Sequence, residues 1–383
     1  MTSVRRRSAR ALGVALAVLA LAEVSASAAR EHAASQASRR PAPARAVPAV
    51  PAPQYIRDRI TDLGRNFDGR VGIAVRSVDD GWETGWKDHE LYPQQSVSKL
   101  CVSITALDAV DRGRIGLDDQ VTLTRADLTL FHQPIAGEIL KDGSYTTTLG
   151  DLMLRAITTS DNTANDRLMR AVGGPQAVRA MIARKHLGAI HFANGERLMQ
   201  SRIAGVTWSQ DYAINGKFFE VRDALPMKVR TAAFNRYVTS PYDGAAPAAV
   251  VNALARLKRG ELLSADSTAH LLDIMGHTRT GPNRLKGGLE PGWTLSHKTG
   301  TGQELGGKQA GYNDIGILTA PDGRSYAVAV MIKLTSVPLP VRMTLMNNVV
   351  RAVITQHQML YGSPYAAQGA NSRERAPRID ERR

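Results

Sequence analysis

The first of three short polar stretches carries residue types that nucleophilic catalysis needs. In Ser96-Val97-Ser98-Lys99, a serine and a lysine stand three positions apart. On a helix such residues share a face, so the amine can touch the hydroxyl. A lysine with a lowered pKa, or a carboxylate acting through water, can take the serine proton and create a nucleophile. The N-terminus of that helix would also point backbone N–H groups at an oxyanion forming beside Ser96.

The second stretch is Ser160-Asp161-Asn162, which we expect to lie between two helices. Ser160 can relay a proton to a leaving nitrogen, and Asn162 can bind both a substrate amide and a lysine ammonium. The same three residue types are also the best helix N-caps, so a purely structural role fits the stretch by itself.

The third stretch is Lys298-Thr299-Gly300-Thr301-Gly302, directly after an apolar segment at 293–295. A lysine at a strand edge can attract a substrate carboxylate, and the small Gly300 lets a ligand lie flush against the strand. The alternative interpretation is a glycine-rich turn that ends the strand.

Apolar periodicity predicts the elements that must hold these stretches. We expect strands at both ends of the folded part and a helical block at about 113–240. This order predicts an α+β fold, in which one antiparallel sheet built from both ends of the chain is flanked by helices. An all-helical lobe would leave the site in a cleft between lobe and sheet. The expected helices are 55–67, 96–110, 149–158, 163–172, 175–185, 247–257, 267–275 and 343–356, and the expected strands are 71–78, 82–86, 293–298, 312–320 and 325–334.

In this order and on these elements, the three stretches resemble the SxxK, SDN and KTG signature of class A β-lactamases. The resemblance covers about residues 54–361 and is supported by the stretches 116–119, 173–175 and 260–264. The SDN form favours this class over most peptidases of the same superfamily.

The resemblance implies a role for each residue that matches the signature. Ser96 would be the acylated nucleophile, with Lys99 in its activation, and Ser160 would protonate the β-lactam nitrogen. Asn162 would hold the amide of the substrate side chain. The substrate carboxylate and the oxyanion would be bound by the remaining positions, which are Lys298 and Thr299 for the carboxylate and the N–H groups of Ser96 and Thr301 for the oxyanion.

Release of the acyl group requires a glutamate that activates water, and class A enzymes carry it in an ExxLN motif. The best match is Glu196-Arg197-Leu198-Met199-Gln200, where Gln200 offers a donor and an acceptor to a water in place of the usual Asn. A solvated loop carboxylate is the alternative interpretation of Glu196. Glu220 and Asp211 are the fallback candidates for the base.

The region around this glutamate departs from the family pattern. Pro175 and Pro241 are 66 positions apart, which is roughly two dozen more than we expect for the family. The insert contains Trp208, Tyr212, Phe218 and Phe219, so we expect it to pack as a lid or flap. The salt bridge that usually closes this loop cannot be assigned.

Three further residues have a functional and an ordinary interpretation. Arg284, 14 residues before Lys298, is either a second carboxylate-binding group or an ordinary surface arginine. His132 lies where an aromatic gate is usual, and we expect it to face solvent. Cys101 follows Ser96 on an apolar helix, and we expect a buried, inert thiol.

The ends of the chain predict export. Residues 1–28 read as a signal peptide, with four arginines before a short apolar run and a small-residue cleavage site, although an uncleaved anchor remains open. Residues 29–53 read as an Ala/Pro-rich linker and 362–383 as a disordered tail, around a catalytic domain at 54–361. We therefore expect a periplasmic or secreted monomer without stable membrane insertion.

Charge and composition exclude several classes. The whole chain carries a net charge of +14, but residues 54–361 hold 36 Lys and Arg against 30 Asp and Glu, a net charge of only +6. No basic stripe is interleaved with aromatics, so nucleic-acid binding is not expected. One cysteine and no HExxH arrangement give no reason to expect a metal or another cofactor.

Three functions therefore remain on the sequence evidence. The first is hydrolysis of a small-molecule β-lactam through an acyl-enzyme. The second is a penicillin-binding peptidase or related serine hydrolase acting on D-Ala-D-Ala stems. The third is a non-enzymatic, envelope-binding module, which the complete set of motif residues disfavours.

Overall fold

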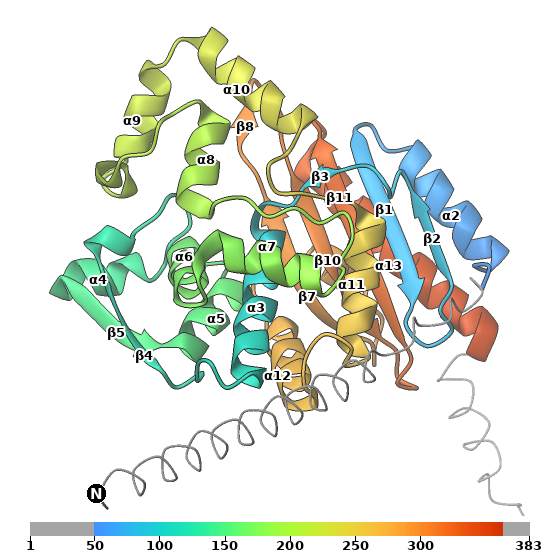
Figure 1. Cartoon of the computed structure of the whole chain (residues 1–383). Helices are drawn as coiled ribbons and strands as arrows, with labels where there is room; N and C mark the ends of the chain where they lie inside the picture. The colour runs from blue at the N-terminus through green and yellow to red at the C-terminus, as the bar shows by residue number, and fades with distance from the viewer. Residues whose placement is uncertain (1–49, 363–383) are drawn as a thin grey trace, which may run out of the picture. The chain divides into compact units, whose positions relative to one another are not determined.

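A computed structural model describes residues 50–362, and the element labels below follow Figure 1. The predicted signal peptide, residues 29–49 of the predicted linker and the tail beyond residue 362 lie outside the described residues. Val50 opens the described chain, and Pro51 bridges to Glu83 at the edge of the main sheet.

The main sheet has five strands in the order β2-β1-β11-β10-β7, and all neighbouring strands are antiparallel. Its first two strands come from the N-terminal part and the other three from the C-terminal part, as the sequence predicted (Figure 1). β7 is an edge strand, so one side of its backbone is free of strand partners. The strand bounds are β1 Arg70–Ser77, β2 Glu83–Trp86, β7 Thr294–Thr301, β10 Tyr312–Thr319 and β11 Ser325–Leu334.

Both faces of this sheet are buried, which explains the nearly continuous apolar run of β11. Tyr326, Val328 and Val330 lie in a core that β11 shares with α2 and α13. Ala327 and Ala329 alternate with them and lie in the larger core, on the other face. The helices of that larger core include α3, α5, α6, α7, α11 and α12. The sheet is therefore the middle of three layers, as expected for an α+β fold.

Helices occupy the middle of the chain and its two ends. Four helices have an end at or near the candidate site residues: α3 begins at Lys99, α5 ends just before Ser160, α6 begins at Asn162 and α8 begins at Glu196. The helix bounds are α2 Gln54–Arg65, α3 Lys99–Asp111, α4 Ala136–Asp142, α5 Leu149–Thr158, α6 Asn162–Ala171, α7 Gly174–Arg184, α8 Glu196–Ala204, α9 Lys217–Ala224, α10 Met227–Thr239, α11 Pro247–Lys258, α12 Ala265–Gly276 and α13 Leu339–Tyr361.

The structure differs from the sequence expectations in three places. The block at 113–240 is not wholly helical, because β4 (Gln120–Thr124) and β5 (Ser144–Thr148) form a two-stranded sheet. Their threonine-rich alternation of exposed and buried residues is a strand pattern. The Lys298 stretch does not end its strand, since β7 continues to Thr301. Finally, Ser96 lies on a 3₁₀ turn, η1 (Gln95–Ser98), and the α-helix begins only at Lys99.

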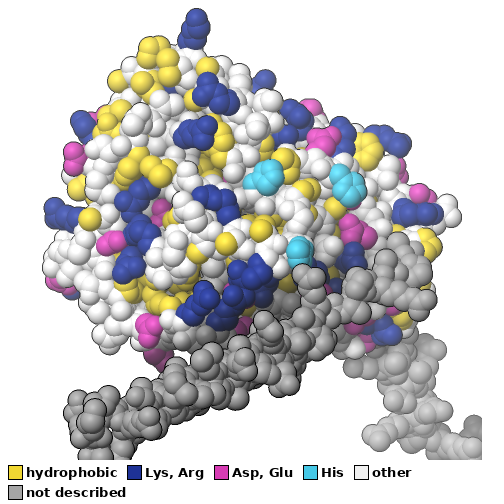
Figure 2. Space-filling view, viewed as in Figure 1, with side chains coloured by type: hydrophobic (Ala, Val, Ile, Leu, Met, Phe, Trp, Pro, Cys, Tyr) yellow, Lys and Arg dark blue, Asp and Glu magenta, His cyan; other side chains and the backbone are white. Residues whose placement is uncertain are grey.

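The surface of the described part is mixed in character. On the face drawn in Figure 2, Lys and Arg side chains outnumber Asp and Glu and lie in several separate groups. From residue 50 to residue 362, no helix combines the length and apolarity needed to cross a bilayer.

Candidate active site

The nucleophile candidate and its lysine are in direct contact. Lys99 Nζ donates to Ser96 Oγ at 2.8 Å. The 3₁₀ turn brings the two side chains together because residues three apart eclipse each other on such a turn. Lys99 is fully buried, so its amine meets only protein groups and the cleft. The contact gives Ser96 Oγ a partner that can exchange its proton.

The SDN stretch divides its two possible roles among its residues. Asp161 is the N-cap of α6 and accepts from the backbone N–H of Ala164 at 2.9 Å. Ser160, with φ of 64°, is in the left-handed region, which turns its side chain and carbonyl towards the lysine. Lys99 Nζ donates to Ser160 O at 2.9 Å and to Asn162 Oδ1 at 2.5 Å. Capping therefore explains Asp161, while Ser160 and Asn162 face the cleft.

Lys298, on β7, also contacts Ser160. Its ammonium donates to Ser160 Oγ at 3.0 Å and to the Thr299 carbonyl at 3.0 Å. Burial removes water from Lys298, and the nearby Lys99 repels its charge, so both lower the pKa of Lys298 well below its ordinary value. A proton shared between Lys298 and Ser160 is therefore easily transferred.

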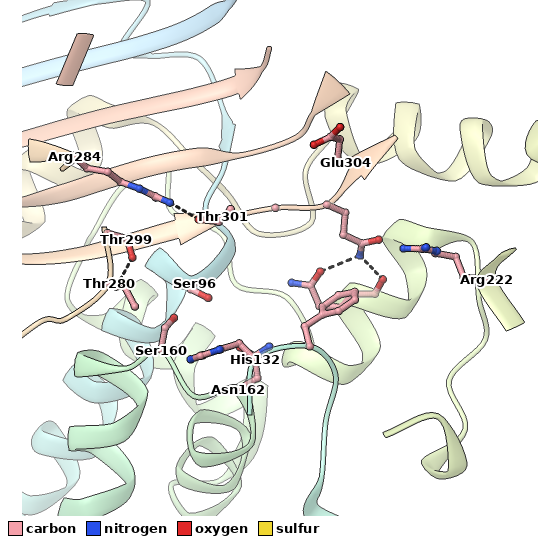
Figure 3. A pocket seen from close by; sticks show the side chains of 14 residues that line it. Ser96, His132, Ser160, Asn162, Arg222, Thr280, Arg284, Thr299, Thr301 and Glu304 are labelled. Atoms are coloured by element: carbon pink, nitrogen blue, oxygen red, sulfur yellow. Dashed lines mark hydrogen bonds between the residues drawn. The ribbon is translucent and has the colours of Figure 1, made fainter. Parts of the chain in front are cut away.

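The register of β7 directs one of its N–H groups into the cleft. Gly302 N donates to Gly311 O at 2.7 Å, and Thr301, the last residue of β7, directly precedes Gly302. Since N–H directions alternate along an antiparallel strand, the Thr301 N–H points away from β10, towards the free edge. Ser96 lies on this side of β7 (Figure 3). The Thr301 N–H is therefore available to a developing oxyanion.

Gly300 allows β7 to pass very close to the nucleophile turn. A Cβ at this position would lie 2.3 Å from the carbonyl oxygen of Gln94, which precedes that turn. Only glycine permits this approach.

Glu196 is the first residue of α8 and is buried, with 2% of its surface exposed. Its Oε1 lies 3.3 Å from Lys99 Nζ, and its Oε2 accepts from Gln200 Nε2 at 3.1 Å. It is therefore not a solvated loop carboxylate. The fallback residues Glu220 and Asp211 are exposed and do not line the cavity.

A second buried carboxylate fixes the backbone of this glutamate. Asp166 accepts from the Glu196 N–H at 2.9 Å and 3.1 Å through its two oxygens. Burial, reinforced by the charge of Glu196, raises the pKa of Asp166 to about 6. Sequence reasoning missed this residue, although it stands in the SDNTAND run, five positions after Asp161.

Of the groups described above, Ser96, Ser160, Asn162, Gln200 and Thr301 line one cavity of about 470 Å³, while Lys99, Lys298 and Glu196 lie behind its wall (Figure 3). Ser96 lies between a polar end, formed by Thr280, Thr299 and Arg284, and a far end where Arg222 of α9 lies (Figure 3). The complete lining comprises Ser96, Phe131, His132, Ser160, Asn162, Gln200, Arg222, Thr280, Arg284, Thr299, Thr301, Gly302, Gln303 and Glu304.

Arg284 is a buried part of the cavity wall, not an ordinary surface arginine. Its guanidinium donates to the carbonyls of Gly300 and Asn313, at 3.1 Å and 2.7 Å, and to Thr301 Oγ1 at 2.5 Å. Most of its donors thus hold β7, where the residues facing the cleft lie. His132 is exposed at the rim, and its carbonyl accepts from the Asn162 N–H at 2.9 Å.

The insert packs beside the cavity through aromatic contacts. Phe218 and Phe219 of α9 lie 5.3 Å and 5.9 Å, between ring centroids, from the ring of Phe131. Arg222, on the same helix, lines the far end of the cavity. The guanidinium carbon of Arg222 lies 4.9 Å from the ring centroid of Phe219. The insert therefore forms part of the wall around the site.

Cys101 is buried on α3, and burial raises the pKa of its thiol to about 12. It does not line the cavity. No cluster of His, Cys, Asp and Glu able to hold a metal ion occurs in the described range 50–362.

Comparison with known proteins agrees with this fold. A sequence model of the β-lactamase enzyme family matches residues 55–357. The extended-spectrum β-lactamase PER-1 of Pseudomonas aeruginosa is 29% identical over 280 residues, covering 73% of this chain and 79% of that protein. A β-lactamase of Bacteroides uniformis is 28% identical, covering 72% of this chain and 82% of its own.

Solved structures give the same result. A β-lactamase from Chitinophaga pinensis has a TM-score of 0.65 at 26% identity, covering 78% of this chain and 97% of its own. The TLA-1 extended-spectrum β-lactamase has a TM-score of 0.65 at 25% identity, covering 79% and 97%. Fold and site thus define a serine hydrolase of the class A β-lactamase type. The chain belongs to the β-lactamase enzyme family.

Proposed function

We propose that the protein hydrolyses β-lactams through an acyl-enzyme on Ser96. The observation that carries this proposal is the contact of Ser96 Oγ with Lys99 Nζ at 2.8 Å, in a cleft that Ser160 and Lys298 also face. The β-lactam carbonyl would lie against Ser96 Oγ, with the N–H groups of Ser96 and Thr301 binding the oxyanion.

In acylation, a bond forms between Ser96 Oγ and the carbonyl carbon, and the ring C–N bond breaks. The hydroxyl proton passes to Lys99, or through a water to Glu196; either base is within reach. The ring nitrogen takes the proton of Ser160 Oγ, which Lys298 at 3.0 Å or Lys99 at 3.3 Å replaces. The low pKa of Lys298 makes that return of a proton easy.

In deacylation, Glu196 takes a proton from a water whose oxygen attacks the acyl carbon. The ester bond to Ser96 Oγ then breaks, and the hydroxyl recovers a proton. Glu196 Oε1 lies 3.3 Å from Lys99 Nζ, which itself contacts Ser96 Oγ, so the proton taken from the water can return from Glu196 to Ser96 Oγ. Gln200 donates to that carboxylate at 3.1 Å, which fixes its orientation.

The ends of the cavity suggest how the substrate lies. The carboxylate would meet Lys298, Thr299 and Arg284, while Asn162 would bind the amide of the substrate side chain. That side chain would then extend to the far end, between Phe131 and Arg222.

Time-resolved mass spectrometry with benzylpenicillin tests the proposal. We expect a one-to-one adduct on Ser96 that forms and then disappears, and no adduct with Ser96→Ala. A long-lived adduct would instead support a penicillin-binding peptidase. Complete absence of both an adduct and hydrolysis of the penicillin would overturn both and leave a binding module.

We also propose that the mature protein is an exported monomer. The motivating observations are the basic and apolar segments before residue 28 and the small-residue cleavage site. N-terminal sequencing of protein recovered from the periplasm or medium should begin near Ala29, and sedimentation should give the mass of one chain. An unprocessed, membrane-associated chain would contradict the export proposal.

A further inference from the structure

A chain of three glutamine side chains connects the rim of the cavity to Glu196. Gln303 lies just after β7, Gln200 lies on α8, and Gln95 immediately precedes Ser96. Gln303 Nε2 donates to Gln200 Oε1 at 3.0 Å. Gln200 Nε2 in turn donates to Glu196 Oε2 at 3.1 Å and to Gln95 Oε1 at 2.9 Å.

The polarity of this chain is fixed at its Gln303 end by a group that cannot reverse. At one end, Gln303 Nε2 also donates to the backbone carbonyl of Gln200, at 2.8 Å, which can only accept. At the other end, Gln95 Nε2 donates to Tyr237 Oη at 2.6 Å, and that hydroxyl donates to Asp243 Oδ1 at 2.9 Å. The amide group of Gln303 therefore has one allowed orientation.

This leaves Gln200 one orientation as well. If its amide were reversed, its oxygen would face Glu196 and Gln95 Oε1, both acceptors, and its nitrogen would face the Gln303 donor. In the observed orientation both of its amide hydrogens are used, and one of them is on Glu196. Gln200 and Gln95 are buried, so water cannot easily replace a lost partner.

We infer that Gln303 is a positioning residue for Glu196 and acts through Gln200. It holds the Gln200 amide so that this amide presents a hydrogen to the carboxylate, which keeps Glu196 aimed at the acyl group on Ser96. The inference rests on the function proposed above. It assigns to the rim between β7 and β8 (Glu304–Leu305), which forms part of the cavity wall, a second role in the release of the acyl group.

The test is the lifetime of the benzylpenicillin acyl-enzyme in Gln303→Met, which keeps the length of the side chain but removes the amide. We expect deacylation to slow about three- to tenfold, as for the loss of one neutral hydrogen bond. Gln303→Glu would set an acceptor against both Gln200 oxygens, so it should slow deacylation further. Lys308 is exposed on β9 (Lys308–Gln309), which pairs with β8 directly after Gln303. Lys308→Ala is therefore the matched control and should leave the lifetime unchanged.

The decisive comparison repeats Gln303→Met in a Glu196→Gln background. If Gln303 acts through Glu196, Gln303→Met should not lengthen the acyl-enzyme lifetime any further in that background. An unchanged lifetime in the wild-type background, or the same slowing in both backgrounds, would overturn the inference. A wild-type enzyme that forms no adduct at all would instead show that the proposed function itself fails.

Discussion

Replacing Glu196 by glutamine should separate the two halves of the reaction. The substitution keeps the side-chain volume and an oxygen that can accept from Gln200, but removes the group that takes a proton from water. Lys99 still has oxygen acceptors on Ser96, Ser160 and Asn162, so we expect the variant to fold.

The expected size of the effect follows from the role of a general base. Such a group contributes about 10²- to 10⁴-fold to a rate, which corresponds to about 2.7–5.4 kcal/mol in the barrier to deacylation. The upper half of this range is expected here, because Glu196 is buried and leaves no bulk water to act in its place. The acyl-enzyme should then outlive the wild-type species by about a thousandfold or more.

The assay combines stopped-flow hydrolysis of a chromogenic cephalosporin with mass spectrometry of the quenched protein. Glu196→Gln should give a burst of one product per enzyme, followed by a slow phase, with the adduct on Ser96. Glu220→Gln is the control, since that carboxylate is exposed and paired with Lys217 at 2.9 Å. Steady turnover of Glu196→Gln at the wild-type rate would refute the reasoning, and the base would have to be another group.

Three further predictions follow from buried groups. Burial raises the pKa of Asp243 to about 7, so between about pH 4 and 7 the folded protein keeps a proton that the unfolded chain has lost; this contribution to stability falls as pH rises. Urea unfolding at several pH values should therefore show a flatter profile for Asp243→Asn across that window, and an identical slope would contradict it. Gly300→Ala should cost about 1–3 kcal/mol in urea unfolding and slow acylation, because its Cβ would meet Gln94 O at 2.3 Å; unchanged acylation would argue against close packing there. Cys101, with its pKa raised to about 12, should react with a thiol reagent only after denaturation, and rapid labelling of the native protein would exclude the buried position.

The sequence predicted the fold well where local signals were strong. The helix at 149–158 and the strand at 325–334 have the predicted bounds, because clear apolar periodicity is flanked by polar or turn residues. The β4–β5 pair was missed, since its short threonine-rich strands lie among strong helical patterns. The extension of β7 through Gly300 was missed for a related reason. Glycine indicates a turn in isolation, and only the neighbouring strand reveals why it stays extended.

The sequence predicted candidate site residues that stand in a motif. It did not predict those that act through contacts with residues far away in the chain. Gln95 and Gln303 carry no sequence signal, since glutamine is an ordinary surface residue. Their roles depend on Gln200, which is 105 positions from one and 103 from the other. Asp166 was visible in its run, but nothing in that run indicates that its carboxylate meets the backbone of Glu196, 30 positions away.

The amino-acid sequence by itself determined the chemistry available to this protein: a serine beside a lysine, an amide and hydroxyl loop, a lysine on a strand, and a sheet built from both ends of the chain. The motifs and the individual strands and helices are local features, because periodicity and short spacing act within a few residues, and the order of these elements along the chain then indicated the sheet. Tertiary structure alone decided which carboxylate lies next to Lys99, which amide orients it, and which strand edge faces Ser96. Such choices depend on distances between segments far apart in the chain, and burial then makes each unmatched donor or acceptor costly enough to leave one arrangement.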